Sequence, residues 1–261
     1  MTHHRLTARL LAAAILFFVP QAIAYGQEAA KSRPLAVVEL FTSQGCGSCP
    51  AADAILADLA QSGDVVALAY HVDYWDYLGW RDTLATADNT TRQYDYSSAF
   101  GSRSVYTPQA VVNGMAHVNG ADRDAMDKAI AETSGGDGLP VEVALSYKGD
   151  KVVIETGAGE VPDGEAHVML VYFNPATTVE ITRGRNQGRS FTFWNSVSSY
   201  HSAGVWHGQE TRFELPVSQV KRKGSGGCAV LVQAMQPDGT PGRILGAALL
   251  HRPKAGERGY R

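Results

Sequence analysis

Two cysteines separated by two residues are the side chains in this sequence best placed for covalent chemistry. Cys46-Gly47-Ser48-Cys49 stands between an apolar run at residues 36–41 and an amphipathic helical pattern. Free N–H groups and the positive end of the helix dipole stabilise an anion there, and the thiolate is the reactive form of cysteine. The spacing predicts a redox-active pair in which Cys46, at the open end of the helix, attacks a substrate and Cys49 resolves the mixed disulfide.

An inert disulfide and a metal site are the alternatives for the same pair. A structural zinc site needs four ligands, and no second C-x-x-C or H-x-H cluster follows. A copper or zinc carrier could combine Cys46 and Cys49 with His71, because thiolates and imidazole suit soft metals. No Met-rich or His-rich tract supports a carrier, so we expect redox chemistry with neither a metal nor another cofactor. The third cysteine, Cys228, lies in a strand-rich segment that favours burial over a free thiol or a mixed-disulfide partner.

His71 and Asp73 follow the apolar run at residues 65–70, which is typical of a buried parallel strand. The carboxyl ends of parallel strands meet at one edge of a sheet, so both side chains should lie near the turn that carries Cys46. His71 could exchange protons during thiol chemistry, and Asp73 could raise the thiol pKa or relay a proton. The alternative, which we favour, is a polar cluster that anchors the loop.

Two further clusters follow elsewhere in the chain. Four aromatic residues between positions 74 and 80 predict a local core that could also wall the site. Arg183, Arg185 and Arg189 could hold a carboxylate or a phosphate, although a solvated loop is the simpler interpretation.

The elements that position these residues divide into two regions. Hydrophobic patterns predict strands at 36–41, 65–70, 110–112 and 115–118, and helices beginning near Cys46, within 74–100 and over 122–132. The order is β-α-β-α-β-β-α. A Gly/Ser/Asp stretch at 133–138 is of linker type, and strands then follow at 141–147, 152–155, 166–173, 178–182, 190–194, 211–215, 228–235 and 244–251. We therefore expect an α/β domain over 35–133 followed by a β-rich, sandwich-like domain over 139–252.

One further motif, Thr107-Pro108, directly precedes the predicted hairpin. Together with the C-x-x-C motif after a strand and the closing helix, it resembles the thioredoxin-like superfamily. That resemblance implies a thioredoxin-like domain over 35–133, a cis Pro108 facing the dithiol, and a substrate-docking edge formed by Thr107 and Pro108. Segments 38–46, 71–76 and 106–114 resemble, more narrowly, a family of exported bacterial thioredoxin-like proteins known only as a domain of unknown function. Gly45 and the Gly-Ser pair depart from ordinary thioredoxin, which leaves the redox direction open.

The N-terminus has the layout of a secretory signal peptide. Arg5 and Arg9 precede an apolar run at residues 10–19, and Ala22-Ile23-Ala24 supplies a cleavage pattern. We expect residues 1–24 to be removed, although an uncleaved anchor is the alternative, and no membrane span to remain. Export to the bacterial periplasm or beyond the cell would place the cysteines where disulfides persist. A net charge of −3 over 261 residues gives no reason to expect nucleic-acid binding.

These observations predict an exported thiol–disulfide oxidoreductase that acts through Cys46 and Cys49. Its partner would be a thiol- or disulfide-bearing protein or small molecule. The alternatives are a non-catalytic exported binding module on a thioredoxin-like scaffold and the copper or zinc carrier described above.

Overall fold

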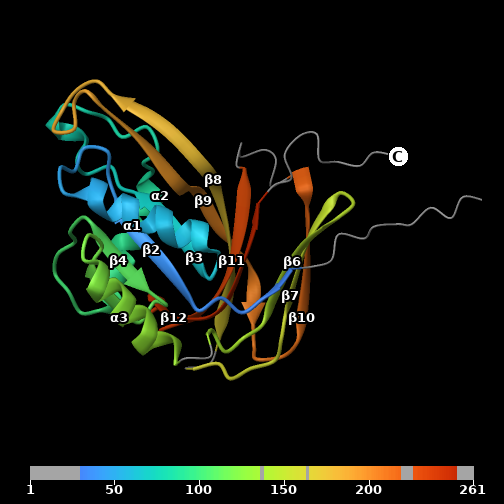
Figure 1. The fold of residues 1–261 in the computed structure, drawn as a ribbon. Helices are drawn as coiled ribbons and strands as arrows, with labels where there is room; N and C mark the ends of the chain where they lie inside the picture. Colours follow the sequence, from blue (N-terminus) through green and yellow to red (C-terminus); the bar gives the residue numbers. More distant parts are fainter. Residues whose placement is uncertain (1–29, 136–137, 163–164, 219–225, 252–261) are drawn as a thin grey trace, which may run out of the picture.

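The computed structural model describes residues 30–135, 138–162, 165–218 and 226–251 (Figure 1). The predicted signal peptide lies outside the described residues. The helical elements are α1 (Cys49–Ser62), the short 3-10 helix η1 (Asp76–Leu78), α2 (Ala87–Ala99) and α3 (Arg123–Ser134). The strands are β1 (Ala30–Ser32), β2 (Ala36–Thr42), β3 (Val65–His71), β4 (Gln109–Val112), β5 (Ala116–Asn119), β6 (Val143–Lys148), β7 (Lys151–Thr156), β8 (Ala166–Ile181), β9 (Arg189–Trp206), β10 (Thr211–Pro216), β11 (Gly227–Met235) and β12 (Pro241–His251).

Most of the strands belong to one mixed sheet. Eight of them pair in the order β12-β11-β8-β9-β3-β2-β4-β5, and β1-β6-β7-β10 form a second, four-stranded sheet. β2 and β3 run parallel, while β4 pairs antiparallel on the other side of β2. The remaining edge of β3 pairs with β9 through Ala69 and Ser196. The strands that lead into the dithiol and those of the C-terminal half therefore share a sheet.

The fold class expected from the sequence is wrong. An α/β domain of thioredoxin type followed by a separate sandwich-like domain would keep two sheets apart at the linker near residues 133–138. The described residues are instead mostly strand, and the eight-stranded sheet joins β2–β5 to β8, β9, β11 and β12 (Figure 1). The strands and helices predicted between residues 36 and 132 are present. Their local periodicity indicates the type of each element but not its distant pairing partner.

Buried side chains on both faces of this sheet hold the layers together. On one face, α1 and α3 pack against β2, β3 and β4 through residues that include Leu56 and Met126. On the other face, α2 contributes Tyr96 to a cluster that extends from Phe41 in β2 to Leu231 in β11. A third cluster lies between the two sheets. The second cluster crosses the predicted boundary, so packing joins the two regions as directly as strand pairing does.

Local sequence signals fix the ends of the helices. The Thr86 side chain accepts a hydrogen bond from the Asn89 N–H at the start of α2, and Asp122 accepts one from Ala125 at the start of α3. α1 ends at Gly63, whose φ of +80° favours glycine. None of the helices in the described residues has the length and apolar character needed to cross a membrane.

The β8–β9 hairpin is the element that differs most from the local prediction. β8 and β9 have 16 and 18 residues; β8 joins the two short strands predicted at 166–173 and 178–182, and β9 extends the one predicted at 190–194. β8 pairs with β11 over Ala166–Phe173, and beyond that point β9 is its partner within the described residues, as far as Ile181 and Arg189. The resulting arm carries its tip, residues 182–188, to the loop that follows β2 (Figure 1).

Candidate active site

Cys46 and Cys49 are joined by a disulfide at the start of α1, with their Cα atoms 5.4 Å apart. β2 ends at Thr42, and the turn that follows is held by hydrogen bonds from the Cys46 and Gly45 N–H groups to the backbone and side chain of Ser43. Pro50 occupies the first turn of α1, where its missing N–H would have no helical partner. The Ser48 hydroxyl makes no capping bond to the helix and lies 3.5 Å from the Cys46 sulfur.

Neither sulfur is exposed in this structure. Cys46 and Cys49 are both 0% accessible to solvent. The expectation that Cys46 lies at an open end of the helix is therefore wrong for the disulfide form. The tip of the β8–β9 hairpin lies against this turn, and its Asn186 side chain donates hydrogen bonds to the carbonyl oxygens of Gln44 and Cys46. Arg183, Arg185 and Arg189 are all exposed, as expected for a solvated loop, but the stem of Arg185 also lies beside Gly47.

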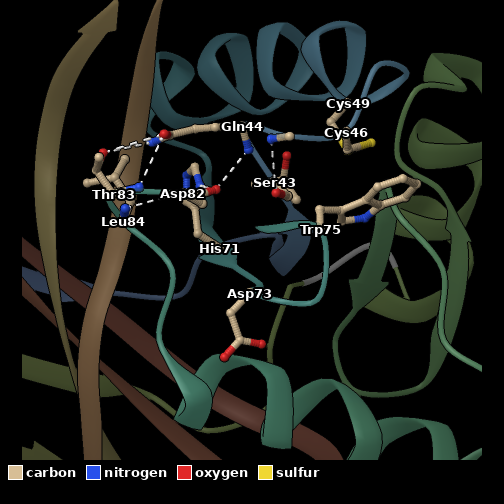
Figure 2. A network of polar contacts seen from close by, with 12 residues as sticks. Ser43, Gln44, Cys46, Cys49, His71, Asp73, Trp75, Asp82, Thr83 and Leu84 are labelled. Atoms are coloured by element: carbon tan, nitrogen blue, oxygen red, sulfur yellow. Dashed lines mark hydrogen bonds and ion pairs between the residues drawn. A yellow bond between two sulfur atoms is a disulfide. The ribbon is translucent and has the colours of Figure 1, made fainter. Parts of the chain in front are cut away.

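Trp75 connects the cysteine turn to the Thr107–Pro108 segment. Its indole N–H donates a 2.8 Å hydrogen bond to the Thr107 hydroxyl, and its Cβ lies next to Gly45. Figure 2 shows the Trp75 ring beside the two cysteines. The Thr107–Pro108 peptide bond is cis, as the superfamily resemblance implied. Because Gln109 at the start of β4 pairs with Phe41, this segment lies directly before β4 at the same end of the sheet as the cysteine turn.

His71 reaches the cysteine turn through a second residue, Asp82. The fully buried His71 lies at the end of β3, and its Nδ1 is 2.8 Å from an Asp82 oxygen that also accepts the Gln44 N–H (Figure 2). Burial alone would lower the pKa of His71, but the charge and hydrogen bond of Asp82 raise it above its usual value. Burial alone would raise the pKa of Asp82, yet His71 and the Gln44 and Leu84 N–H groups hold it below its usual value. The pair anchors the loop 73–87 to the cysteine turn.

Asp73 is not brought to the disulfide. Its carboxylate accepts a hydrogen bond from the Thr90 hydroxyl of α2 at 2.8 Å, and Figure 2 shows it well away from the two cysteines. Asp73 therefore links the loop after β3 to α2, which is the anchoring role that the sequence left open as the alternative.

Asp53 is an acidic residue near the site that sequence reasoning missed. It lies four residues after Cys49 on α1, so the two side chains share one face of the helix. The Thr42 hydroxyl donates a 2.8 Å hydrogen bond to its carboxylate. Burial raises the pKa of Asp53 to about 6, against the lowering effects of His71 and Thr42. The four-residue spacing from Cys49 was the signal that could have found it.

The remaining sequence candidates are placed as follows. Within the described part of the chain, no three His, Cys, Asp or Glu side chains are grouped so as to hold a metal ion. Cys228 lies buried in β11, as predicted, and burial raises the pKa of its thiol to about 11. It is therefore an inert thiol remote from the cysteine turn.

Comparison with known proteins identifies one family and two similar structures. A family model described as "Protein of unknown function (DUF1223)" matches residues 37–233. The crystal structure of protein AGR_C_4864 from Agrobacterium tumefaciens is 45% identical, covers 86% of this chain and 97% of its own, and superposes with a TM-score of 0.77. HBP35 of Porphyromonas gingivalis is 14% identical, with 90% and 81% coverage and a TM-score of 0.61, a likeness of fold alone. No curated protein matches the chain.

Proposed function

We propose that this chain, which belongs to the DUF1223 family of proteins of unknown function, is a thiol–disulfide oxidoreductase acting through Cys46 and Cys49. The observation that carries the proposal is a disulfide closed across the first turn of α1. A thiolate released at this position gains the stabilisation that a helix N-terminus provides to an anion. The Ser48 hydroxyl makes no capping bond to the helix and lies close to the Cys46 sulfur, so it can donate a hydrogen bond to a thiolate there.

The proposed exchange proceeds in two balanced steps. A substrate thiolate attacks the Cys46 sulfur, the Cys46–Cys49 bond breaks, and Cys49 leaves as a thiolate that takes up a proton. A second substrate thiolate then attacks the substrate sulfur of the mixed disulfide and releases Cys46. The substrate gains a disulfide and the protein gains two electrons and two protons. The reverse sequence reduces a substrate disulfide.

Residues around the cysteine turn support this chemistry. Thr107 and Pro108 directly precede β4, and Trp75 holds Thr107 near the turn, so they are the proposed substrate-docking edge. Asp53, on the same helix face as Cys49, has a carboxyl that changes protonation near neutral pH and suits exchange of the Cys49 proton. We further propose that the C-x-x-C turn and the Thr107–Pro108 segment, rather than the sheet as a whole, are what the chain shares with the thioredoxin-like superfamily. Export, with residues 1–24 as signal, would keep the pair oxidised between turnovers.

A second candidate function follows from the burial of both cysteines. A disulfide with 0% exposed surface fits a structural bond in a non-catalytic binding module. In that case Cys46 and Cys49 would stabilise the start of α1 and take no part in exchange.

Reduction of a model protein disulfide with dithiothreitol as electron donor separates the two candidates. We expect turnover by the parent protein and its loss in Cys46→Ser, because serine cannot form the mixed disulfide. Cys228→Ala is the matched control and should keep the parent rate, since that thiol is buried in β11 away from the site. Activity that persists in Cys46→Ser would exclude the proposed mechanism.

A further inference from the structure

The tip of the β8–β9 hairpin, residues 182–188, is hydrogen bonded to the backbone of the cysteine turn, in which both cysteines are fully buried. Asn186 is 2% exposed, and its side-chain amide donates one hydrogen bond to the Gln44 carbonyl at 2.9 Å and one to the Cys46 carbonyl at 3.0 Å. Asn186 is separated from Cys46 by 140 positions in the chain. Arg189 donates to the Asn186 side-chain oxygen, which fixes the orientation of the amide.

Arg185 extends this contact across the cysteine turn. Its stem lies next to Gly47, where a β-carbon would be 3.7 Å from Arg185 Cδ. Its guanidinium lies over the Trp75 ring, 5.4 Å from the ring centre, and Trp75 itself contacts Gly45. Arg185 therefore spans the turn from Gly47, which follows Cys46, to Trp75, which contacts Gly45 on the other side of Cys46.

A third contact holds the tip from the opposite side. Gly184 has a φ of +78°, and a β-carbon there would come within 3.1 Å of the Trp80 Cβ. Beyond these contacts the tip is open to solvent, because Arg183, Gln187 and Gly188 are exposed. A segment held by few polar contacts and little apolar burial opens at a small fraction of the global free energy of unfolding.

We infer that the hairpin tip is a removable cover that controls access of thiols to the Cys46–Cys49 disulfide. The inference rests on the proposed function and concerns the regulation of that same site. With the tip closed, the disulfide is shielded from small thiols, and exchange proceeds from the fraction of molecules in which Asn186 and Arg185 have left the cysteine turn. Substrates that hold the tip open are selected over free small thiols.

Reduction by dithiothreitol measures this opening directly. One dithiothreitol thiolate attacks the Cys46 sulfur, Cys49 leaves and is protonated, and the second thiol closes a cyclic disulfide that releases Cys46. Dithiothreitol loses two electrons and the protein pair gains them. Alkylation of samples taken over time, followed by intact mass, counts the reduced cysteines at low dithiothreitol concentration, where the parent rate is slow.

We expect Asn186→Ala to speed this reduction by about tenfold, because opening then no longer breaks the two hydrogen bonds to the cysteine turn. Arg185→Ala should speed it by roughly several-fold, through loss of the contact with Trp75. Arg183→Ala is the matched control, since it removes the same charge from the exposed part of the tip and should leave the rate unchanged. Urea midpoints of all variants exclude global unfolding as the cause, and Arg185→Ala, a change at an exposed side chain, keeps the test valid if Asn186→Ala does not fold.

Equal reduction rates in the parent, Asn186→Ala and Arg185→Ala would overturn the inference that the hairpin tip controls access of thiols to the disulfide. Its failure is distinguishable from failure of the proposed function. Faster thiol access in the tip variants without turnover of a protein disulfide supports the cover and rejects the oxidoreductase. Turnover by the parent at a rate that the tip variants do not change in either assay supports the oxidoreductase and rejects the cover.

Discussion

Asp53 shows how the neighbourhood of the disulfide departs from an ordinary helix surface. A carboxylate one turn beyond Cys49 would normally be ionised at neutral pH, but burial beside Thr42 raises its pKa to about 6. Nearby, Asp82 raises the pKa of His71 and His71 lowers the pKa of Asp82, so each favours the charged form of the other. The cysteine turn therefore lies beside one hydrogen-bonded His–Asp pair and one carboxyl whose pKa is about 6.

The raised pKa of Asp53 predicts a pH dependence of stability. The folded protein holds this proton more tightly than the unfolded chain, so the associated stability is present below pH 4 and is lost as pH rises through 6. Asp53→Asn should remove that loss and stabilise the protein at pH 8 by roughly 1–3 kcal/mol, with little change near pH 4. Urea unfolding at the two pH values measures the difference. A variant less stable than the parent at pH 8 would show that ionised Asp53 is favourable in the fold.

At this scale the sequence identified the residues whose type and spacing are informative on their own. Cys46 and Cys49 form the disulfide, His71 ends its strand, and the cis Thr107–Pro108 bond directly precedes β4. Asp82 and Asn186 escaped notice because each acts on the Gln44 backbone from a distant segment, 38 and 142 positions away. The local sequence around Asn186 does not indicate that its amide will hydrogen bond to the backbone of the cysteine turn.

At the scale of elements, α2 is anchored to the sheet by a buried charge pair. Arg92 of α2 donates to both oxygens of Glu39 in β2, at 2.7 and 3.1 Å, and to the Gln233 side chain of β11 at 2.9 Å. The Tyr96 hydroxyl also donates to Glu39. These contacts join a helix and strands from both halves of the chain, so they tie the site region to the C-terminal strands.

Replacing Arg92 by Met should destabilise the protein by about 3–5 kcal/mol, because it leaves the Glu39 carboxylate buried without its cation. Arg123→Ala is the control. Its ion pairs with Asp58 and Asp127 are solvent-exposed, so its removal should change stability by less than about 0.5 kcal/mol. Chemical denaturation monitored by tryptophan fluorescence gives both values. A decrease in the free energy of unfolding of less than about 1 kcal/mol in Arg92→Met would contradict a stabilising role for the Arg92–Glu39 pair.

The hairpin arm is the element that local patterns described least well. Pro175 interrupts the apolar alternation of β8, and a proline inside a strand pattern favours a break or an edge. The structure accommodates it because, among the described residues, those of β8 beyond Phe173 pair with β9 only. The sequence therefore predicts two short strands, whereas the structure has one long strand, β8, that leads to the tip beside the candidate active site.

For the whole molecule, composition alone suggested a division that strand pairing does not follow. The Gly/Ser/Asp stretch at 133–138 begins in the last turn of α3, which ends at Ser134. The parallel pairing of Ala69 with Ser196 and the buried cluster from Phe41 to Leu231 nevertheless run across it. One consequence concerns the candidate active site, because the C-terminal half supplies the arm whose Asn186 is hydrogen bonded to the cysteine turn.

The reduction potential of the Cys46–Cys49 pair tests the central claim most directly. The protein would be equilibrated with dithiothreitol or glutathione buffers of known potential, and the oxidised fraction read by alkylation and mass. An oxidoreductase should have a potential above about −300 mV, within the range of roughly −270 to −120 mV that exchange proteins span. A value below about −300 mV would mark a structural disulfide and contradict the proposed function.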